Sequence, residues 1–176
     1  PETARSLHGL AFIKEPMGQY EEAMALYHEA LAMRRRLFRD DHADLVATVS
    51  GIAYLSRTMG RLDDAAERFR EVLEMRRRAL RPDHPDLQPA LGNLGVTLDE
   101  LGRAAEAEAV WSELLALRER TLRAADWRLG NTRSRLGACI AAQGRYAEAE
   151  PMLIGAYESL KAGADTPRAK GEDFLH

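Results

Sequence analysis

Two histidines, an aspartate and a cysteine are the side chains whose types and spacing could serve a metal ion or a nucleophilic reaction. His42 and His84 stand 42 residues apart, and Asp126 follows at the same interval. On stacked, equivalent helices such residues would lie on the order of 10 Å apart. That is too far to share a zinc ion whose ligands each lie about 2 Å away. We interpret all three as helix-start residues and expect neither a metal site nor a cofactor.

Cys139 is the only thiol, and the sequence specifies no base beside it. Its offset in the repeat described below is shared with Ile13, Leu55 and Thr97, so we interpret it as a packing residue and not as a nucleophile. One cysteine excludes an intramolecular disulfide, which fits a reducing cytoplasm. The glycine-rich phosphate loop, the lysine-bearing strand and the His-Arg-Asp element of a kinase are absent from these residues. We expect no catalytic residues and no enzymatic activity.

Charge and composition narrow the range of partners. The 25 lysines and arginines oppose 28 acidic residues with both signs interspersed, for a formal charge of −3. The chain therefore lacks the basic field that attracts nucleic acid. An apolar fraction of 45% over 176 residues predicts a folded core. Because no apolar run approaches the roughly 18 residues of a membrane span and no signal peptide is evident, we expect a cytoplasmic protein without a membrane partner.

The chain repeats itself every 42 residues. Four glycines keep this spacing, five residues after each comes an alanine, and four residues later comes a large apolar side chain. The glycines are Gly18, Gly60, Gly102 and Gly144, the alanines Ala23, Ala65, Ala107 and Ala149, and the large residues Tyr27, Phe69, Trp111 and Leu153. Apolar positions spaced i, i+3 and i+4 on both sides of each glycine predict two amphipathic helices joined by a glycine turn.

The alanine and the large residue four positions later form the A-x-x-x-F element of the tetratricopeptide repeat. The 42-residue period, with His84-Pro85-Asp86-Leu87 and Gly144-Arg145-Tyr146-Ala147-Glu148-Ala149-Glu150, resembles the kinesin-light-chain type of this repeat. The stretch from Asp126 to Cys139 is similar to the last repeats of bacterial tetratricopeptide-containing serine/threonine protein kinases. The resemblance implies an all-α fold, a right-handed α-solenoid of four helix-turn-helix repeats that holds a protein or an extended peptide. The kinase likeness implies a regulatory or docking region of a larger signalling protein.

We expect one solenoid domain over residues 1–165, with repeats over 1–41, 42–83, 84–125 and 126–165. Residues 166–176 should be the truncated start of a further helix. Because the chain opens with Pro1 instead of Met and ends abruptly at His176, we expect a fragment of a longer protein.

The second helix of each repeat should be unusually long. The usual helix-stopping proline of the tetratricopeptide pattern is replaced by Arg35, Arg77, Glu119 and Lys161. Without this breaker the helix should continue by about two turns. Pro151 predicts a bend or a late start in the last second helix. Trp127 is expected to pack between helices.

The first helix of each repeat has a face that its own second helix does not use. Residues at the offsets of Leu7, Leu10 and Ala11 should face the second helix, which leaves the opposite, concave wall for a partner. On that wall an apolar column of aromatic and aliphatic side chains should form an interface. The candidate binding residues are Arg5, His8, Phe12, Tyr54, Arg57, Asn93, Val96, Glu100, Asn131 and Arg135.

The resemblance also implies that asparagines of the first helices grip a peptide backbone, as Asn93 and Asn131 could do here. At the offset of Asn93 the other repeats carry Gly9, Gly51 and Arg135, so a complete asparagine row is not formed.

Three alternatives stay open at this point. The arginine clusters at 34–36 and 76–78 are either solvated helix ends or a basic edge that docks an acidic partner. The open ends of the solenoid could mediate self-association, giving a homo-oligomer without a peptide ligand. A sensor that binds a small molecule would need an enclosed pocket, which an open groove does not provide.

Overall fold

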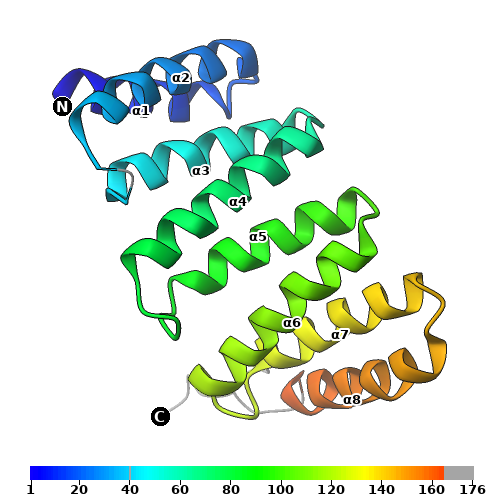
Figure 1. The fold of residues 1–176 in the computed structure, drawn as a ribbon. Coiled ribbons are helices and arrows are strands. Elements are labelled where there is room, and N and C mark those ends of the chain that lie inside the picture. Colours follow the sequence, from blue (N-terminus) through cyan, green and yellow to red (C-terminus); the bar gives the residue numbers. More distant parts are fainter. Residues whose placement is uncertain (40, 165–176) are drawn as a thin grey trace, which may run out of the picture. The chain divides into compact units, whose positions relative to one another are not determined.

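The computed structural model describes residues 1–39 and 41–164, and this part of the chain is an all-α helical repeat fold (Figure 1). It contains eight helices and no strand. The helices are α1 (Glu2–Lys14), α2 (Tyr20–Leu37), α3 (Ala43–Thr58), α4 (Leu62–Ala79), α5 (Leu87–Glu100), α6 (Ala104–Thr121), α7 (Trp127–Ala142) and α8 (Tyr146–Ala164). The predicted all-α fold is confirmed, whereas the helix expected over 166–176 lies outside the described residues.

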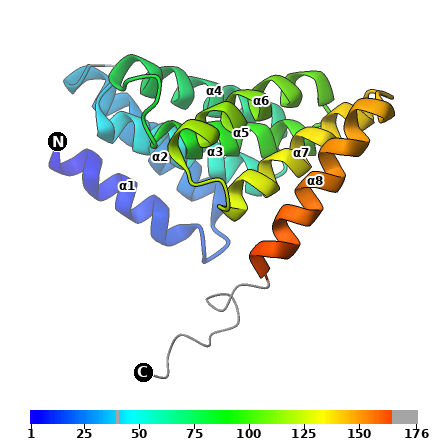
Figure 2. The ribbon, with the colours of Figure 1, turned by 90° about the horizontal axis from the view of Figure 1, so that it is seen from below.

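The helices group into two compact units that divide between Leu101 and Gly102. In the first unit α1 packs on α2, α2 on α3, α3 on α4 and α4 on α5. In the second unit α6 packs on α7 and α7 on α8, and Figure 2 shows α7 and α8 as an antiparallel pair. Within each unit a helix therefore packs on its neighbours in sequence, as in other repeat proteins.

The four repeat glycines make the turns between first and second helices, as predicted. Their φ angles are 74°, 74°, 68° and 79° for Gly18, Gly60, Gly102 and Gly144, in the left-handed region that favours glycine. The residue after the glycine donates its backbone N–H five residues back in three of these turns, for example from Arg61 to Ser56 at 2.9 Å. This bond is typical of a Schellman helix end. In every repeat the second helix begins two residues after the glycine.

Small residues of the first helices let the large residues of the second helices approach closely. Ala11 and Ala53 are 0% exposed, and Tyr27 and Phe69 are each 1% exposed. At Gly137 an added Cβ would lie 2.8 Å from Leu153 Cγ, closer than van der Waals contact allows. The close approach therefore requires a small side chain, as the sequence predicts.

The second helices are long because nothing breaks them at the usual proline position. α2, α4 and α6 each have 18 residues. They end at Leu37, Ala79 and Thr121, two residues after the position where the common repeat pattern has proline.

Pro151 lies inside α8, which still begins at Tyr146 in register with the other second helices. A late start is therefore wrong: Ala149 donates its backbone N–H to the carbonyl of Arg145 at 3.1 Å, so the first turn forms before the proline is reached. Pro151 removes a single donor, and its fixed φ is close to the helical value.

Replacing Gly60 with alanine should destabilise the protein by about 1–2 kcal/mol, because alanine resists a positive φ. Nothing lies within 4 Å of the added Cβ, so the effect comes from the backbone alone. Gly9 is the matched control, since it lies within α1 and its added Cβ is equally unhindered. Gly9→Ala should stabilise by about 0.5–1 kcal/mol. Urea unfolding measures both, and equal signs for the two variants would refute this explanation of the turns.

Candidate functional site

The first helices α3 and α7 begin at side-chain caps. The backbone N–H of Asp44 donates to His42 Nδ1 at 3.1 Å, and that of Arg128 donates to Asp126 Oδ1 at 3.0 Å. Before α5, the N–H of Asp86 donates to His84 Nδ1 at 3.2 Å. These bonds confirm the helix-start role of His42 and Asp126, which are the N-caps of α3 and α7. His84 does not cap α5, because that helix begins at Leu87 after Asp86, which makes no side-chain cap. In residues 1–39 and 41–164 no group of three or more histidines, cysteines and carboxylates is placed to hold a metal ion.

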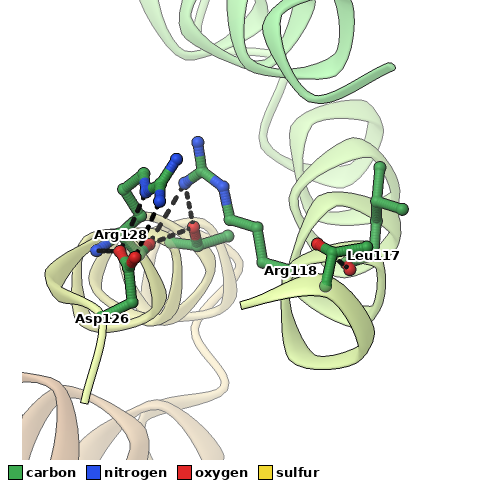
Figure 3. A network of polar contacts seen from close by, with 6 residues as sticks. Leu117, Arg118, Asp126 and Arg128 are labelled. Carbon is green, nitrogen blue, oxygen red and sulfur yellow. Dashed lines mark hydrogen bonds and ion pairs between the residues drawn. The ribbon is translucent and has the colours of Figure 1, made fainter. Parts of the chain in front are cut away.

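One arginine near the end of a second helix ties it to the first helix of the next repeat. Arg34 is buried, and its Nη1 donates to the carbonyl of Asp44 at 2.8 Å and to the hydroxyl of Thr48. In the second unit Arg118 Nη1 likewise donates to the carbonyl of Arg128 at 3.1 Å and to Thr132 Oγ1 at 2.6 Å (Figure 3). The extended end of the second helix thus holds the next first helix in place.

The same tie is weaker between the second and third repeats. Arg76 occupies the equivalent position, but Ala90 stands where the second and fourth repeats have Thr48 and Thr132. Arg76 Nη1 instead lies 3.7 Å from Asp86 Oδ2. The interpretation of the arginine clusters as wholly solvated is therefore wrong for Arg34, because its side chain is buried and its guanidinium donates to a backbone carbonyl and to the buried hydroxyl of Thr48.

Three candidate residues lie together on the first-helix face of the first unit. Tyr54 is 40% exposed, and its ring meets Phe69 edge-on with ring centroids 5.2 Å apart. Asn93 Nδ2 donates to Tyr54 Oη at 2.6 Å, which joins α5 to α3. The guanidinium carbon of Arg57 lies 5.8 Å from the centre of the Tyr54 ring. We call Tyr54, Arg57 and Asn93 the tyrosine cluster.

The candidate residues of α1 divide into exposed and half-buried ones. Phe12 and Arg5 are exposed, and Arg5 lies 3.5 Å from the carboxylate of Glu2. His8 is half-buried, with its ring edge-on to Tyr27 at 5.1 Å and its Nδ1 3.4 Å from Arg34 Nη1. Burial, followed by the positive charge of Arg34, lowers the pKa of His8. His8 therefore contacts interior groups, in contrast to Phe12.

The remaining candidates lie on α5 and α7. Val96 is half-buried and Glu100 is exposed, both on α5. In the second unit Asn131 and Arg135 are exposed on α7, and the guanidinium carbon of Arg135 lies 5.8 Å from the centre of the Trp111 ring.

The sequence analysis did not predict the aromatic rings that lie beneath the first-helix face. Gly51 follows Tyr27 by 24 positions, and Arg135 follows Trp111 by the same number. A Cβ at Gly51 would lie 2.8 Å from Tyr27 Cζ, so this offset of a first helix lies over the aromatic ring of the preceding second helix. The constant 24-residue separation was the available signal.

The position of Trp127, which is not a candidate binding residue, was predicted wrongly. It is 62% exposed, so the expected packing between helices is wrong. Trp127 is the first residue of α7, and side chains in a helix point toward the N-terminus, so no turn of its own helix lies beneath the indole. Cys139, by contrast, is buried like Leu55 and Thr97 at its offset, as a packing residue should be.

Two surface cavities of the first unit lie between α2, α3 and α4. They measure about 170 and 420 Å³. The smaller is lined by Met24, His28, Ile52, Ser56, Arg61, Asp64, Glu67 and Arg68, and the larger by Arg35, Leu45, Val49, Glu71, Met75 and Arg78. Neither includes a candidate residue, so the tyrosine cluster belongs to a different surface.

The chain belongs to the tetratricopeptide repeat family, which it matches over residues 2–78 and again over 45–120. Proteins of this family are generally non-catalytic and serve as protein-interaction scaffolds. No curated protein matches the chain. The part of the chain that the structure describes has no helix with the length and hydrophobicity to cross a membrane.

Solved structures share the fold along most of the chain. A putative kinesin light chain of Podosopora anserina with nearly identical TPR-like repeats is 21% identical, with a TM-score of 0.70, over 96% of this chain and 87% of that one. BtubC (BKLC) from P. vanneervenii is 19% identical, with a TM-score of 0.77, over 98% and 66%. MamA AMB-1 is 23% identical, with a TM-score of 0.68, over 95% and 78%. The resemblance to kinesin-light-chain-like repeat proteins is thereby confirmed at the level of the fold.

Arg118→Ala should lower the free energy of unfolding by about 1.5–3 kcal/mol, because it removes two part-buried hydrogen bonds from a charged donor, one of them to the buried Thr132. Arg120 lies two residues away on the same helix and is exposed, so Arg120→Ala should change stability by less than about 0.5 kcal/mol. Urea unfolding compares the two, and equal losses would show that Arg118 acts only as a surface charge.

Asp126→Asn should remove a pH dependence while keeping the helix cap. Two side-chain hydrogen bonds from Arg128, at 2.9 and 2.7 Å, are the main cause that lowers the pKa of Asp126 from 3.8 to about 2. The stabilisation is therefore present above pH 3.8 and is lost as the pH falls through about 2. Near neutral pH the wild type should be more stable by up to about 1 kcal/mol, as for a partly exposed ion pair. Urea unfolding of both proteins across this range measures the difference, and a difference independent of pH would contradict the assignment.

Proposed function

We propose that the chain is a non-catalytic scaffold that binds a protein or an extended peptide on the wall formed by its first helices. The observation that carries this proposal is the hydrogen bond of 2.6 Å between Asn93 and Tyr54. It links two first helices across the half-exposed tyrosine, so the cluster is ordered before any partner arrives. Ordered side chains lose less conformational entropy on binding, which favours affinity.

The tyrosine cluster has the chemistry of an interface anchor. Tyrosine and arginine are enriched among the residues that dominate binding energy, because each combines a large flat surface with polar groups. Asn93 uses one amide hydrogen on Tyr54. Its second hydrogen and its oxygen can pair with the N–H and C=O groups of an extended peptide.

The other candidates extend this proposal. In the first unit Arg5, Phe12, Val96 and Glu100 would add contacts, and His8 would support the wall from its half-buried place beside Tyr27. In the second unit Asn131 and Arg135 would contact the partner from α7. We further propose that residues 1–165 act as one right-handed solenoid when a partner is bound.

The cellular setting is a separate part of the proposal. The likeness of Asp126–Cys139 to the last repeats of bacterial kinases supports a docking region of a larger, cytoplasmic signalling protein. Sequencing the gene upstream of these residues tests it. A set of kinase motifs there would support this setting, and their absence from the complete gene would refute it.

The double variant Tyr54→Ala, Asn93→Ala should weaken peptide binding by about 1–4 kcal/mol while folding is nearly unchanged. Peptides are first selected from a random display library on the wild-type chain, and their affinities are then measured by calorimetry. Circular dichroism melting checks the fold of each variant.

The control is the double variant Arg35→Ala, Arg77→Ala on the second helices. Arg35 pairs with Glu71 at 2.9 Å and Arg77 with Glu74 at 2.5 Å, both on the exposed surface. This variant should bind like the wild type. If it instead loses affinity steeply with added salt while the tyrosine-cluster variant binds normally, the partner docks on the basic outer edge and the proposal is wrong.

A further inference from the structure

The exposed residues of α7 lie along one side of the helix. A helix turns by about 100° per residue, so these positions fall within about 80° of one another around the axis. They belong to the first-helix wall that contains the candidates Asn131 and Arg135. We call them the α7 stripe, and they are Trp127, Asn131, Arg135, Ala138 and Ala142.

The same face is exposed on a first helix inside the first unit. Ala43 of α3 stands at the repeat offset of Trp127 and is exposed. Tyr54 stands at the offset of Ala138 and is 40% exposed. Helices α4 and α5 follow α3 in this unit and still leave this face open. The exposure of the α7 stripe is therefore a property of the first-helix face, and it does not come from the end of the chain.

Trp127 gives the α7 stripe an apolar group that the other first helices lack at this offset. Ala43 and Pro85 occupy the offset in the second and third repeats. The indole is 62% exposed, because no turn of α7 precedes it. Tryptophan has a large apolar surface and is enriched among the residues that dominate binding energy. A partner that covers this ring with an apolar side chain therefore gains affinity.

The charge of α7 favours an acidic partner. The helix carries three arginines and no acidic residue, whereas α5 carries two acidic residues and no basic one, and α3 carries one of each. Among these arginines, Arg135 lies on the α7 stripe, with its guanidinium carbon 5.8 Å from the centre of the buried Trp111 ring. A guanidinium has five N–H donors in a planar fork that matches a carboxylate. The ring contact sets the position of this fork on the wall.

We propose that the α7 stripe selects extended peptides that carry an apolar side chain and, three or four residues away, a carboxylate. The apolar side chain covers Trp127 and the carboxylate pairs with Arg135. The amide of Asn131, which lies between them on the helix, pairs with the peptide backbone. This inference rests on the proposed function, because it assigns a peptide specificity to one part of the proposed wall.

The spacing in the peptide follows from helix geometry. Trp127 and Arg135 are eight positions apart in the sequence. At about 1.5 Å per residue this separates them by about 12 Å along the axis of α7. An extended peptide rises by about 3.3 Å per residue, so three or four residues cover the same distance.

The first test varies this spacing in synthetic peptides. Each peptide is a short chain of serine and threonine with one leucine and one glutamate, placed one, three, four or seven positions apart. Calorimetry with the full chain measures their affinities. The peptides with spacings of three and four should bind more than about tenfold tighter than the other two, because only they reach both groups at once.

Tryptophan fluorescence reports the contact at Trp127. The chain has two tryptophans, and Trp111 is only 3% exposed. Acrylamide quenching of the wild type should therefore fall when the peptide covers Trp127. Trp127→Ala should lower the affinity more than about tenfold and remove this change in quenching. Tyr146→Ala is the matched control, because Tyr146 is also the first residue of its helix and is 71% exposed, and it should bind like the wild type.

A charge exchange tests Arg135. Arg135→Glu should weaken binding of the glutamate peptide more than about tenfold, and it should prefer the peptide in which lysine replaces glutamate, because the attraction is reversed. A purely structural role of Arg135 would weaken both peptides equally. Arg120→Glu changes an exposed arginine of α6 and should keep the preference for glutamate. Circular dichroism checks the fold of every variant.

Three results would overturn the proposal. They are equal affinities at all four spacings, acrylamide quenching that does not change on binding, and an Arg135→Glu variant that still prefers glutamate. If Tyr54→Ala, Asn93→Ala weakens peptide binding while Trp127→Ala and Arg135→Glu bind like the wild type, the proposed function stands and this specificity alone is wrong. If the chain binds no peptide of the display library or of the synthetic set, both are wrong.

Discussion

The packing of each first helix against the second helix before it is the constraint on which the other features of this chain depend. A pair of helices cannot bury both of its apolar faces, so the pair needs a neighbour. Arg34 and Arg118 show how the neighbour is held, since each donates to a backbone carbonyl and a threonine of the next first helix. The same contact explains the length of the second helices, because both arginines lie in the last turn of α2 or α6, which must form before the guanidinium can reach across.

This inter-repeat contact also builds the candidate binding wall. The aromatic residue of a second helix packs under the following first helix, so the 24-residue offset lies directly above its ring. Gly51 has no side chain, so the Tyr27 ring fits closely against the backbone there, whereas the guanidinium of Arg135 lies over the Trp111 ring. The character of the wall is therefore decided by pairs of residues from successive repeats, and a single repeat does not contain the information.

Much of the fold could be predicted from the sequence because its signals are local. The glycine turns require only a positive φ, and the helix caps at His42 and Asp126 require only a side chain two residues before a backbone donor. The tyrosine cluster was predicted in part: periodicity indicated a shared face, but the bond between Tyr54 and Asn93 depends on the rotamers of two helices. Arg34 and Trp127 were misjudged because their burial depends on what the next or the same repeat places around them.

The different faces of a first helix tolerate amino-acid substitutions to different degrees. This difference indicates which residues can determine specificity for a partner. Successive residues of a helix point about 100° apart, so Leu55 is buried against the preceding repeat while its neighbour Tyr54 lies on the wall. Residues that face the second helix of the same unit are small, namely Ala11, Ala53 and Gly137. At the wall offset the chain instead carries Gly9, Gly51, Asn93 and Arg135. Packing forbids a larger side chain at the first set and also at Gly51, where an added Cβ would lie 2.8 Å from Tyr27 Cζ, whereas Gly9 has open space around it and Asn93 and Arg135 already carry larger side chains. The wall can therefore change its chemistry between repeats only where the ring beneath it leaves space.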